Sequence, residues 1–267
     1  MIFIMKKEIS KGYVSSSYKM NLTTFTEFAK SKKIAPSLDL VRVCVLFFFD
    51  RLKLNIDKSS SIAVVGGSSD EPELKLLDID LENVDIFGIS PGEIFLDVNT
   101  HSVPKKYQGS YDLVLCTGVA EHIYNHENLI ECLSDLTVKS GLIFFCFPIS
   151  NMYHGSPDYF SAGCTTDYFI KFFERKGLLI EDSGSLGGER IYFFTHTLNQ
   201  WPNIRSYNSP LLFHIVHCLG LSELPRPPIK FLFHRLWARA FAWLIPKSIS
   251  NEDQWQHTGW LLARKIH

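Results

Sequence analysis

The chain has 267 residues, of which 46% are hydrophobic, and its 27 basic residues nearly cancel its 28 acidic ones. This length and composition predict one large α/β core with additions and exclude a disordered chain. The near-zero net charge gives no reason to expect nucleic acid as a partner. No stretch offers the roughly 20 uninterrupted apolar residues of a membrane-spanning helix, so we expect the chain not to cross a membrane.

The pattern of apolar and polar residues divides the chain into three regions. Residues 1–59 are expected to form an N-terminal helical segment, with helices over 23–32 and 38–54. Residues 60–195 alternate strand-like and helix-like segments and are expected to form the main domain. Residues 196–267 lose this alternation, are rich in proline and aromatic residues, and are expected to form a C-terminal helical extension.

The main domain predicts a parallel sheet. Several strand candidates are continuous apolar runs, which is typical of strands covered by helices on both faces. Strands and helices in alternation imply a doubly wound α/β sheet, whose ligands bind beyond the carboxyl ends of the strands. The expected strands cover residues 62–65, 85–89, 94–98, 113–116, 143–147, 178–182 and 190–194, and the expected helices cover 72–81, 126–138 and 165–176.

A glycine-rich turn follows the first expected strand. Residues 61–69 read SIAVVGGSS, and a helix is expected to begin near Pro72. Glycines at such a turn let the backbone approach a ligand closely, and the next helix presents free N–H groups. Neither the GxGxxG spacing of dinucleotide binders nor the GxxxxGK[ST] phosphate loop is present, which disfavours a dehydrogenase or an ATP-binding protein. A tight turn without a ligand is the alternative.

A second motif spans the fourth and fifth expected strands. Residues 111–123 read YDLVLCTGVAEHI, and residues 139–148 read KSGLIFFCFP. This order resembles the class I S-adenosylmethionine-dependent methyltransferases, in which a YDLV strand ends in a turn with EH and a K-x-G-G turn introduces the next strand. The resemblance covers residues 61–194. It implies a Rossmann-like class I methyltransferase sheet and S-adenosylmethionine as the cofactor.

The resemblance also implies a set of donor-binding residues. Gly66 and Gly67 stand at the first glycine turn, which in the family faces the methionine part of the donor. After the second strand the family usually has a carboxylate for the ribose hydroxyls, whereas this chain has Ser90, with Glu93 in the next turn as a substitute. The set is completed by Asp97 and Asn99 at the adenine edge and by Cys116 and Thr117 after the fourth strand.

His122 is one candidate for the base that takes a proton from the acceptor. It stands beside Glu121 after the fourth strand, and the pKa of histidine lies near neutrality. The alternative is that both residues begin a helix and form only local hydrogen bonds. In some relatives an E-x-x-E-H arrangement supplies metal ligands. Its first position here is Gly118, so we expect no metal.

A polar and aromatic loop follows the fifth expected strand, on the ligand side of the sheet. Residues 150–163 include Tyr153, His154, Asp158 and Tyr159, which suit a carbohydrate because aromatic rings stack on sugars while Asp and His bind hydroxyls. His154 is the first choice for the base, with Asp158 as its orienting partner. A rigid loop with a buried histidine is the alternative. The loop also resembles a segment of methyltransferases encoded among bacterial surface-polysaccharide (O-antigen) genes.

The first expectation for the function is therefore O-methylation of a sugar or glycan hydroxyl by direct displacement. A methyltransferase acting on a small metabolite is one alternative, and a catalytically inactive module that binds S-adenosylmethionine is another. The alternative that does not use S-adenosylmethionine is an NAD-dependent or nucleotide-sugar enzyme with a related sheet.

Residues 230–245 are expected to form a basic, aromatic helix. Arg235 and Arg239 lie four positions apart and share one face, and such a helix can lie in a membrane interface. A lid or a homodimer contact is the favoured alternative. The six cysteines include no CxxC pair and lie mostly in apolar runs, which is typical of reduced thiols. We therefore expect a cytoplasmic protein, and a peripheral contact at the inner membrane face is the second candidate role of this helix.

Overall fold

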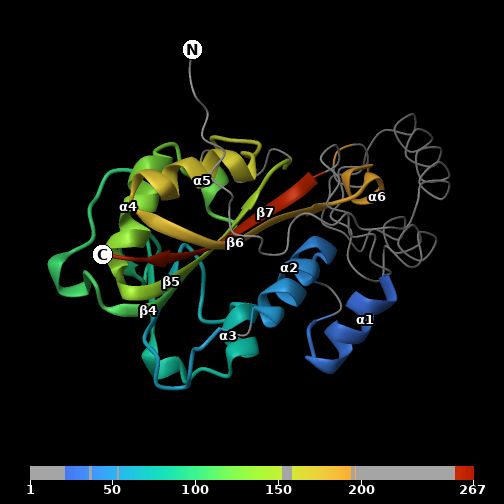
Figure 1. Cartoon of the computed structure of the whole chain (residues 1–267), viewed down its shortest axis with the longest axis horizontal. Helices are drawn as coiled ribbons and strands as arrows, with labels where there is room; N and C mark the ends of the chain where they lie inside the picture. The colour runs from blue at the N-terminus through green and yellow to red at the C-terminus, as the bar shows by residue number, and fades with distance from the viewer. Residues whose placement is uncertain (1–21, 36–37, 53, 152–157, 194–195, 197–255) are drawn as a thin grey trace, which may run out of the picture.

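The computed structural model describes residues 22–35, 38–52, 54–151, 158–193, 196 and 256–267, which form a seven-stranded sheet with helices on both faces (Figure 1). The strand order is β3-β2-β1-β4-β5-β7-β6, and β7 runs antiparallel to its neighbours β5 and β6. The strands are β1 (Ile62–Val65), β2 (Val84–Gly88), β3 (Ile94–Phe95), β4 (Tyr111–Thr117), β5 (Thr137–Pro148), β6 (Leu178–Gly187) and β7 (Gln256–Lys265).

The helices cover the two faces of the sheet. Helices α4 (His126–Leu136) and α5 (Thr166–Arg175) lie on one face, and α1 (Leu22–Ser31), α2 (Leu40–Arg51) and α3 (Pro72–Leu77) lie on the other (Figure 1). The remaining helices are α6 (Glu189–Tyr192) and the short 3₁₀ turns η1 (Leu81–Asn83), η2 (Lys105–Tyr107) and η3 (Ala120–His122).

Alternate residues of the buried strands point into two separate apolar cores. In β1, Val64 belongs to the core under α2, whereas Ala63 and Val65 belong to the core under α4 and α5. Both faces of β1 are covered, because every residue of this strand is at most 2% exposed. This double covering explains the continuous apolar runs in the sequence and confirms the doubly wound fold class.

Side-chain caps fix the amino ends of α5 and α2. Thr165 caps α5 by accepting a hydrogen bond from the N–H of Tyr168, and Gly177 follows that helix with a left-handed φ of 72°. Asp39 caps α2 in the same way, with its carboxylate accepting from the N–H groups of Val41 and Arg42.

Two expectations for the C-terminal part of the chain are wrong. Residues 190–194 were expected to form a strand, but residues 189–192 form helix α6. Residues 256–265, placed by the sequence in a helical extension, form β7, which pairs Leu261 with Phe145 of β5 and Thr258 with Leu186 of β6. The sheet therefore does not end at residue 195, because the end of the chain inserts between two earlier strands.

Among the described residues, no helix has the length and apolar character needed to cross a bilayer. The basic, aromatic helix expected over residues 230–245 lies outside the described residues, so its membrane, lid and dimer roles stay predictions.

Candidate active site

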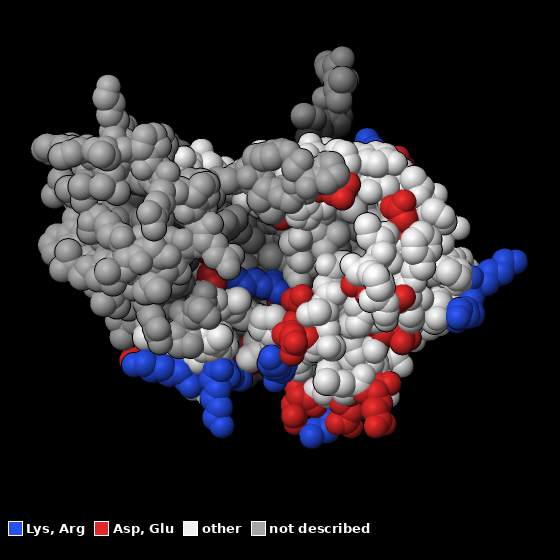
Figure 2. Space-filling model, turned by 180° about the vertical axis from the view of Figure 1, so that it is seen from behind, with Lys and Arg blue, Asp and Glu red and all other residues white. Residues whose placement is uncertain are grey.

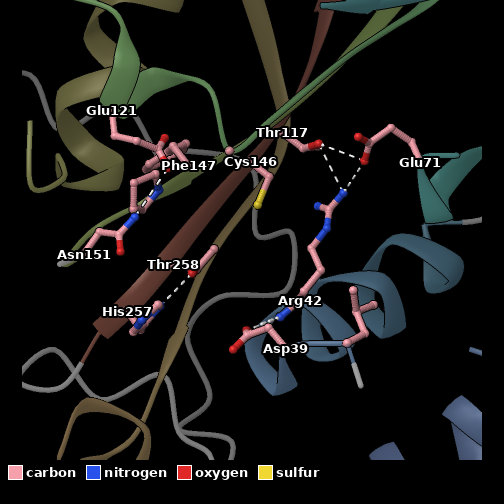
Figure 3. A pocket seen from close by; sticks show the side chains of 13 residues that line it. Asp39, Arg42, Glu71, Thr117, Glu121, Cys146, Phe147, Asn151, His257 and Thr258 are labelled. Carbon is pink, nitrogen blue, oxygen red and sulfur yellow. Dashed lines mark hydrogen bonds and ion pairs between the residues drawn. The ribbon is translucent and has the colours of Figure 1, made fainter. Parts of the chain in front are cut away.

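A pocket of about 340 Å³ opens at the edge of the sheet where β1, β4 and β5 end (Figure 3). Since β7 is antiparallel, its first residues lie at this same edge. The amino end of α2 closes the opposite side, and ring packing of Phe49 on Phe144, with centroids 4.7 Å apart, fixes this helix on the sheet. The pocket is lined by Leu38, Asp39, Arg42, Glu71, Thr117, Gly118, Glu121, Cys146, Phe147, Pro148, Asn151, His257 and Thr258.

An ion network joins α2 to the sheet at the rim of this pocket. The Arg42 Nη2 donates to Glu71 Oε2 at 2.9 Å, to Glu73 Oε2 at 2.7 Å and to Thr117 Oγ1 at 3.1 Å. Glu73 is fully buried, and burial raises the pKa of its carboxyl above the ordinary value. Two carboxylates thus face one guanidinium, so the network carries excess negative charge whenever both are ionised.

Asp39 adds a further carboxyl to the pocket. Its Oδ1 accepts from Val41 and Arg42 N–H at 2.8 and 3.1 Å, whereas its buried Oδ2 has no hydrogen-bond partner among the described residues. Burial raises the pKa of Asp39 to about 6 against the effect of these hydrogen bonds. The carboxyl therefore changes its charge close to neutral pH.

The raised pKa of Asp39 predicts how its replacement changes stability with pH. Because the folded-state pKa lies above the unfolded one, the stability due to the protonated carboxyl is complete below about pH 4 and is lost as pH rises through about 6. Asp39→Asn keeps an oxygen for the helix cap, so we expect its unfolding free energy to exceed that of the wild type at about pH 8 and to approach it at about pH 4. Urea unfolding at both pH values measures this, with Asp70→Asn, whose side chain is 89% exposed, as the control. A difference that shrinks toward pH 8 contradicts the prediction.

Glu121 lies deepest among the acidic side chains that line the pocket. It is 5% exposed, and its Oε2 has no hydrogen-bond partner among the described residues, while Oε1 accepts from Asn151 Nδ2 at 3.4 Å. Its main-chain carbonyl accepts from the N–H groups of Phe160 and Ser161, which fixes the chain after η3. The sequence drew attention to Glu121 only as the neighbour of His122.

His257 is a pocket residue that sequence reasoning missed, because it lies in the unrecognised strand β7. It is 2% exposed, and burial together with the nearby His196 lowers its pKa to about 3, so its ring is neutral at physiological pH. The Nδ1 atom contacts Thr258 Oγ1 at 3.0 Å. The neighbouring His196 contacts Ser150 Oγ through its Nε2 atom at 2.7 Å.

The structure describes two of the three residues expected to act in proton removal, His122 and Asp158. His122 does not line the pocket, and its Nδ1 contacts the main-chain carbonyl of Asp158 at 2.5 Å. Asp158 therefore meets His122 through its backbone. His154, the first choice for the base, lies outside the described residues, and so does its expected pairing with Asp158.

Of the four residues expected around the donor near β1 and β4, Thr117 lines the pocket, and Gly67 lies against Glu71, which also lines it. Gly66 has a left-handed φ of 70°, and a Cβ built there would lie 2.7 Å from Val119 Cγ2, so only glycine fits. Gly67 follows it in the turn, and Thr117 lines the pocket. Cys116, in contrast, is wholly buried in the core under α4, and Cys146 of β5 lines the pocket in its place.

At the end of β2 the carboxylate of Glu93 occupies the space beside the last strand residue. Ser90 is exposed beyond the strand, and its N–H donates to Glu93 Oε2 at 2.9 Å. A Cβ built on Gly88 would overlap the same Oε2 atom. A carboxylate is therefore present at this strand end, although it comes from the following turn.

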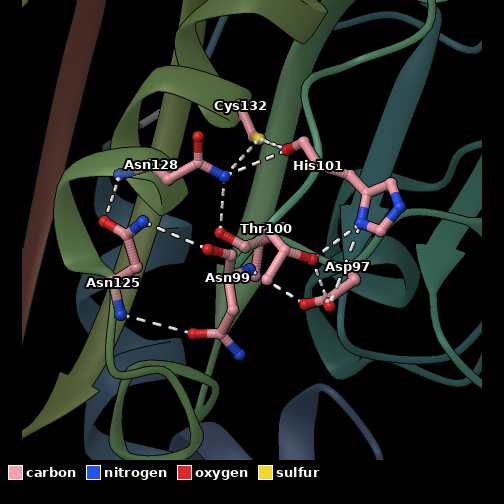
Figure 4. A network of polar contacts seen from close by, with 8 residues as sticks. Asp97, Asn99, Thr100, His101, Asn125, Asn128 and Cys132 are labelled. Atoms are coloured by element: carbon pink, nitrogen blue, oxygen red, sulfur yellow. Dashed lines mark hydrogen bonds and ion pairs between the residues drawn. The ribbon is translucent and has the colours of Figure 1, made fainter.

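Asp97 and Asn99 belong to a polar network that joins the turn after β3 to the start of α4 (Figure 4). Asp97 accepts from the N–H of Asn99 at 2.9 Å and from the hydroxyl of Thr100 at 2.6 Å, and the Thr100 hydrogen bond lowers its pKa. Asn99 Oδ1 accepts from the N–H groups of Tyr124 and Asn125 at 3.0 and 3.3 Å. These contacts fix the turn and occupy both Asp97 oxygens.

Comparison with solved structures relates this fold to a known class. The chain is similar to phosphoethanolamine N-methyltransferase 2 of Haemonchus contortus (9% identity, 93% of this chain and 59% of that chain, TM-score 0.51). It is also similar to a protein from Galdieria sulphuraria provisionally assigned as a sarcosine dimethylglycine methyltransferase (8% identity, 88% of this chain and 85% of that chain, TM-score 0.51). The [4+2]-cyclase SpnF matches at 11% identity over 84% of this chain and 80% of its own, with a TM-score of 0.48.

No protein-family model matches the chain, and no curated protein matches its sequence. The two similarities above a TM-score of 0.5 show that the chain has the Rossmann-like fold of the class I S-adenosylmethionine-dependent methyltransferases.

Proposed function

We propose that the protein is an S-adenosylmethionine-dependent methyltransferase. The observation that carries this proposal is the pocket at the carboxyl edge of β1, β4 and β5, next to a glycine turn that tolerates no side chain at Gly66. Ligands of doubly wound sheets bind at this edge. The similarity of fold to methyltransferases supports the same assignment.

The residues at the strand ends fit the parts of S-adenosylmethionine. Gly118 has a φ of 67° and open space around a built Cβ, which leaves room over the end of β4. Ile89 and Phe95 are 67% and 59% exposed beside the ends of β2 and β3, and such apolar groups suit an adenine ring. Arg42 and Thr117 stand beside the glycine turn, where they would meet the polar end of the methionine part.

The bound donor would supply a strongly electrophilic methyl group. The protein then has to align an acceptor and remove its proton. Glu121, with its unpartnered Oε2, is the pocket residue best placed to receive that proton. His122 and His154 stay candidates from the sequence, although His122 lies outside the pocket lining.

A sugar or glycan hydroxyl is the acceptor that we propose. An aromatic pair supports it: Tyr124 and Phe160 are 59% and 50% exposed, with ring centroids 5.3 Å apart. The Phe160 N–H donates to the main-chain carbonyl of the pocket residue Glu121, and exposed rings in such a segment suit a carbohydrate. A small metabolite stays the second candidate acceptor, and an inactive donor-binding module stays the alternative to an enzyme.

Thermal unfolding with added nucleotides tests the donor. S-adenosylhomocysteine at about 100 times its Kd should contribute about 2.7 kcal/mol and raise the Tm by several degrees, whereas NAD should leave it unchanged. Stabilisation by NAD alone would overturn the proposal. Transfer of label from methyl-labelled S-adenosylmethionine to envelope glycan fractions tests the acceptor. Binding of S-adenosylhomocysteine without any labelled acceptor would favour the inactive module.

A further inference from the structure

Four carboxyl groups and one guanidinium gather at the candidate pocket: Asp39, Glu71 and Glu121 line it, and the lining Arg42 pairs with Glu71 and with the fully buried Glu73. Among the described residues that line the pocket, Arg42 is the one Lys or Arg. Its ion pairs go to Glu71 and Glu73, which leaves Asp39 and Glu121 without a Lys or Arg partner from the lining.

Asp39 and Glu121 each have a carboxyl oxygen that the described residues leave unsatisfied. Asp39 Oδ1 accepts two main-chain hydrogen bonds at the start of α2, whereas its buried Oδ2 has no hydrogen-bond partner among the described residues. Glu121 is 5% exposed, and its Oε2 also lacks a partner there. A buried acceptor without a donor costs free energy, so both oxygens suit a ligand that donates hydrogen bonds to them.

The methyl donor does not balance the charge of these carboxylates. S-adenosylmethionine has a sulfonium, an ammonium and a carboxylate, so its net charge is a single positive one. Together with Arg42 it would face the carboxylates of Asp39, Glu71 and Glu121, which outnumber these two positive charges even with Glu73 protonated. A neutral acceptor would leave this negative excess, and an anionic acceptor would increase it. A cationic acceptor is therefore favoured.

The two unpartnered carboxyls lie away from the guanidinium of the pocket (Figure 3). Glu121 lies on the opposite side of the pocket from Arg42 and Glu71, and the Asp39 carboxyl lies apart from the guanidinium at the start of α2. His257 lines the pocket on the side of Glu121, and burial lowers its pKa to about 3, so its ring is neutral at physiological pH. The described residues of this side thus place no positive charge against a cationic ligand.

We propose that the sugar acceptor is an amino sugar, whose protonated amino group binds Asp39 Oδ2 while a hydroxyl of the same sugar gives its proton to Glu121 and receives the methyl group. The inference rests on the proposed function, since it names the kind of sugar that the same site accepts. The hydroxyl oxygen forms the bond to the methyl carbon as the bond from that carbon to sulfur breaks, and the electron pair stays on sulfur in S-adenosylhomocysteine. Asp39 determines specificity, because it binds a group of the acceptor that does not react.

NMR titration of the complex with S-adenosylhomocysteine tests the ammonium site. The probes are glucosamine, galactosamine and mannosamine, each beside the neutral hexose that has a hydroxyl in place of the amino group. At neutral pH at least one amino sugar should bind about tenfold more tightly than its neutral hexose, as expected for one charge-assisted hydrogen bond. Asp39→Asn should remove this preference, although the same change is expected to stabilise the fold at alkaline pH. Asp70→Asn, with an 89% exposed side chain, is the matched control and should retain the preference.

A second variant separates the roles of the two carboxyls. Glu121→Gln should abolish transfer of labelled methyl to the bound amino sugar and retain the preference for the amino group in binding. Mass spectrometry of the wild-type product should place the methyl group on oxygen. Circular dichroism melting of each variant shows whether a loss of binding or transfer reflects unfolding.

Several results would overturn the amino-sugar inference while leaving the donor assignment in place. They are equal binding of amino and neutral hexoses, a preference retained in Asp39→Asn, a methyl group on nitrogen, and binding of S-adenosylhomocysteine without binding of any amino sugar. Failure of the wild-type protein to bind S-adenosylhomocysteine would instead overturn the proposed function.

Discussion

Truncation of the chain after residue 255 is expected to abolish cooperative folding. The deletion removes β7, whose residues pair with β5 on one side and β6 on the other. It also removes Trp260, Leu261 and Leu262 from the two cores, where each is at most 5% exposed. Loss of such side chains costs about 2–5 kcal/mol each, and the sum approaches the whole stability of a typical domain. Thermal and urea unfolding followed by circular dichroism should show no transition.

A shorter truncation supplies the control for the loss of β7. Ending the chain at Lys265 removes only two exposed residues, Ile266 and His267, and should leave the unfolding midpoint unchanged. A truncation at 255 that still unfolds cooperatively near the wild-type midpoint would contradict the role of β7. The result also matters for the membrane role predicted for residues 230–245. A vesicle-binding test of that segment must retain β7, because a deletion that includes β7 would unfold the protein as well.

Replacement of Arg42 by methionine is expected to cost about 3 kcal/mol of stability. It leaves the fully buried Glu73 without its cation, and removal of one partner from a buried pair typically costs about 3–5 kcal/mol. We expect the lower end because the Arg42 side chain is 18% exposed. Urea unfolding at neutral pH measures the difference.

Two further variants separate this effect from ordinary surface charge. Lys32→Met breaks the exposed Lys32–Asp50 pair and should cost less than about 1 kcal/mol. Combining Arg42→Met with Glu73→Gln should cost less than the sum of the single changes, since neither charge is then left buried alone. An Arg42→Met variant as stable as Lys32→Met would show that the network does not stabilise the fold.

Most of the fold could be predicted from the sequence because its signals are local. The buried strand at 113–116 appears as a continuous apolar run, and Thr165 and Gly177 mark the ends of a helix within a few residues. The apolar run of β7, residues 260–263, has the same length, but it follows a region without alternation of strand-like and helix-like segments, so the local pattern does not assign it to the sheet. Its placement depends on pairing with β5, more than 100 residues earlier in the chain, which a local pattern does not report.

The residues of the candidate site also divide into those with a local sequence signal and those without one. Gly66, Gly67 and Thr117 could be found because they stand at the ends of strands in the chain. Asp39 and Arg42 could not, since they belong to a helix whose pattern indicates only that it packs on the sheet; its contact with the β4 end depends on tertiary packing. Glu93 is an intermediate case. Its position in the turn after the second strand suggested a role from the sequence. The closeness of its carboxylate to Gly88, where a built Cβ would overlap it, appears only in the structure.

The two ends of the segment from 197 to 255 are held at one place in the molecule. His196 contacts Ser150, the main-chain carbonyl of His257 accepts from Ile149 N–H, and the two histidine rings lie 6.2 Å apart. The chain therefore leaves the described fold and returns to it at one place, and each doubling of the length between two such fixed points costs only about 0.6 kcal/mol of closure entropy. Insertions or deletions between these two points should therefore change the free energy of unfolding little. We therefore expect related proteins to differ in the length of this segment, while the strand ends that form the pocket stay the same.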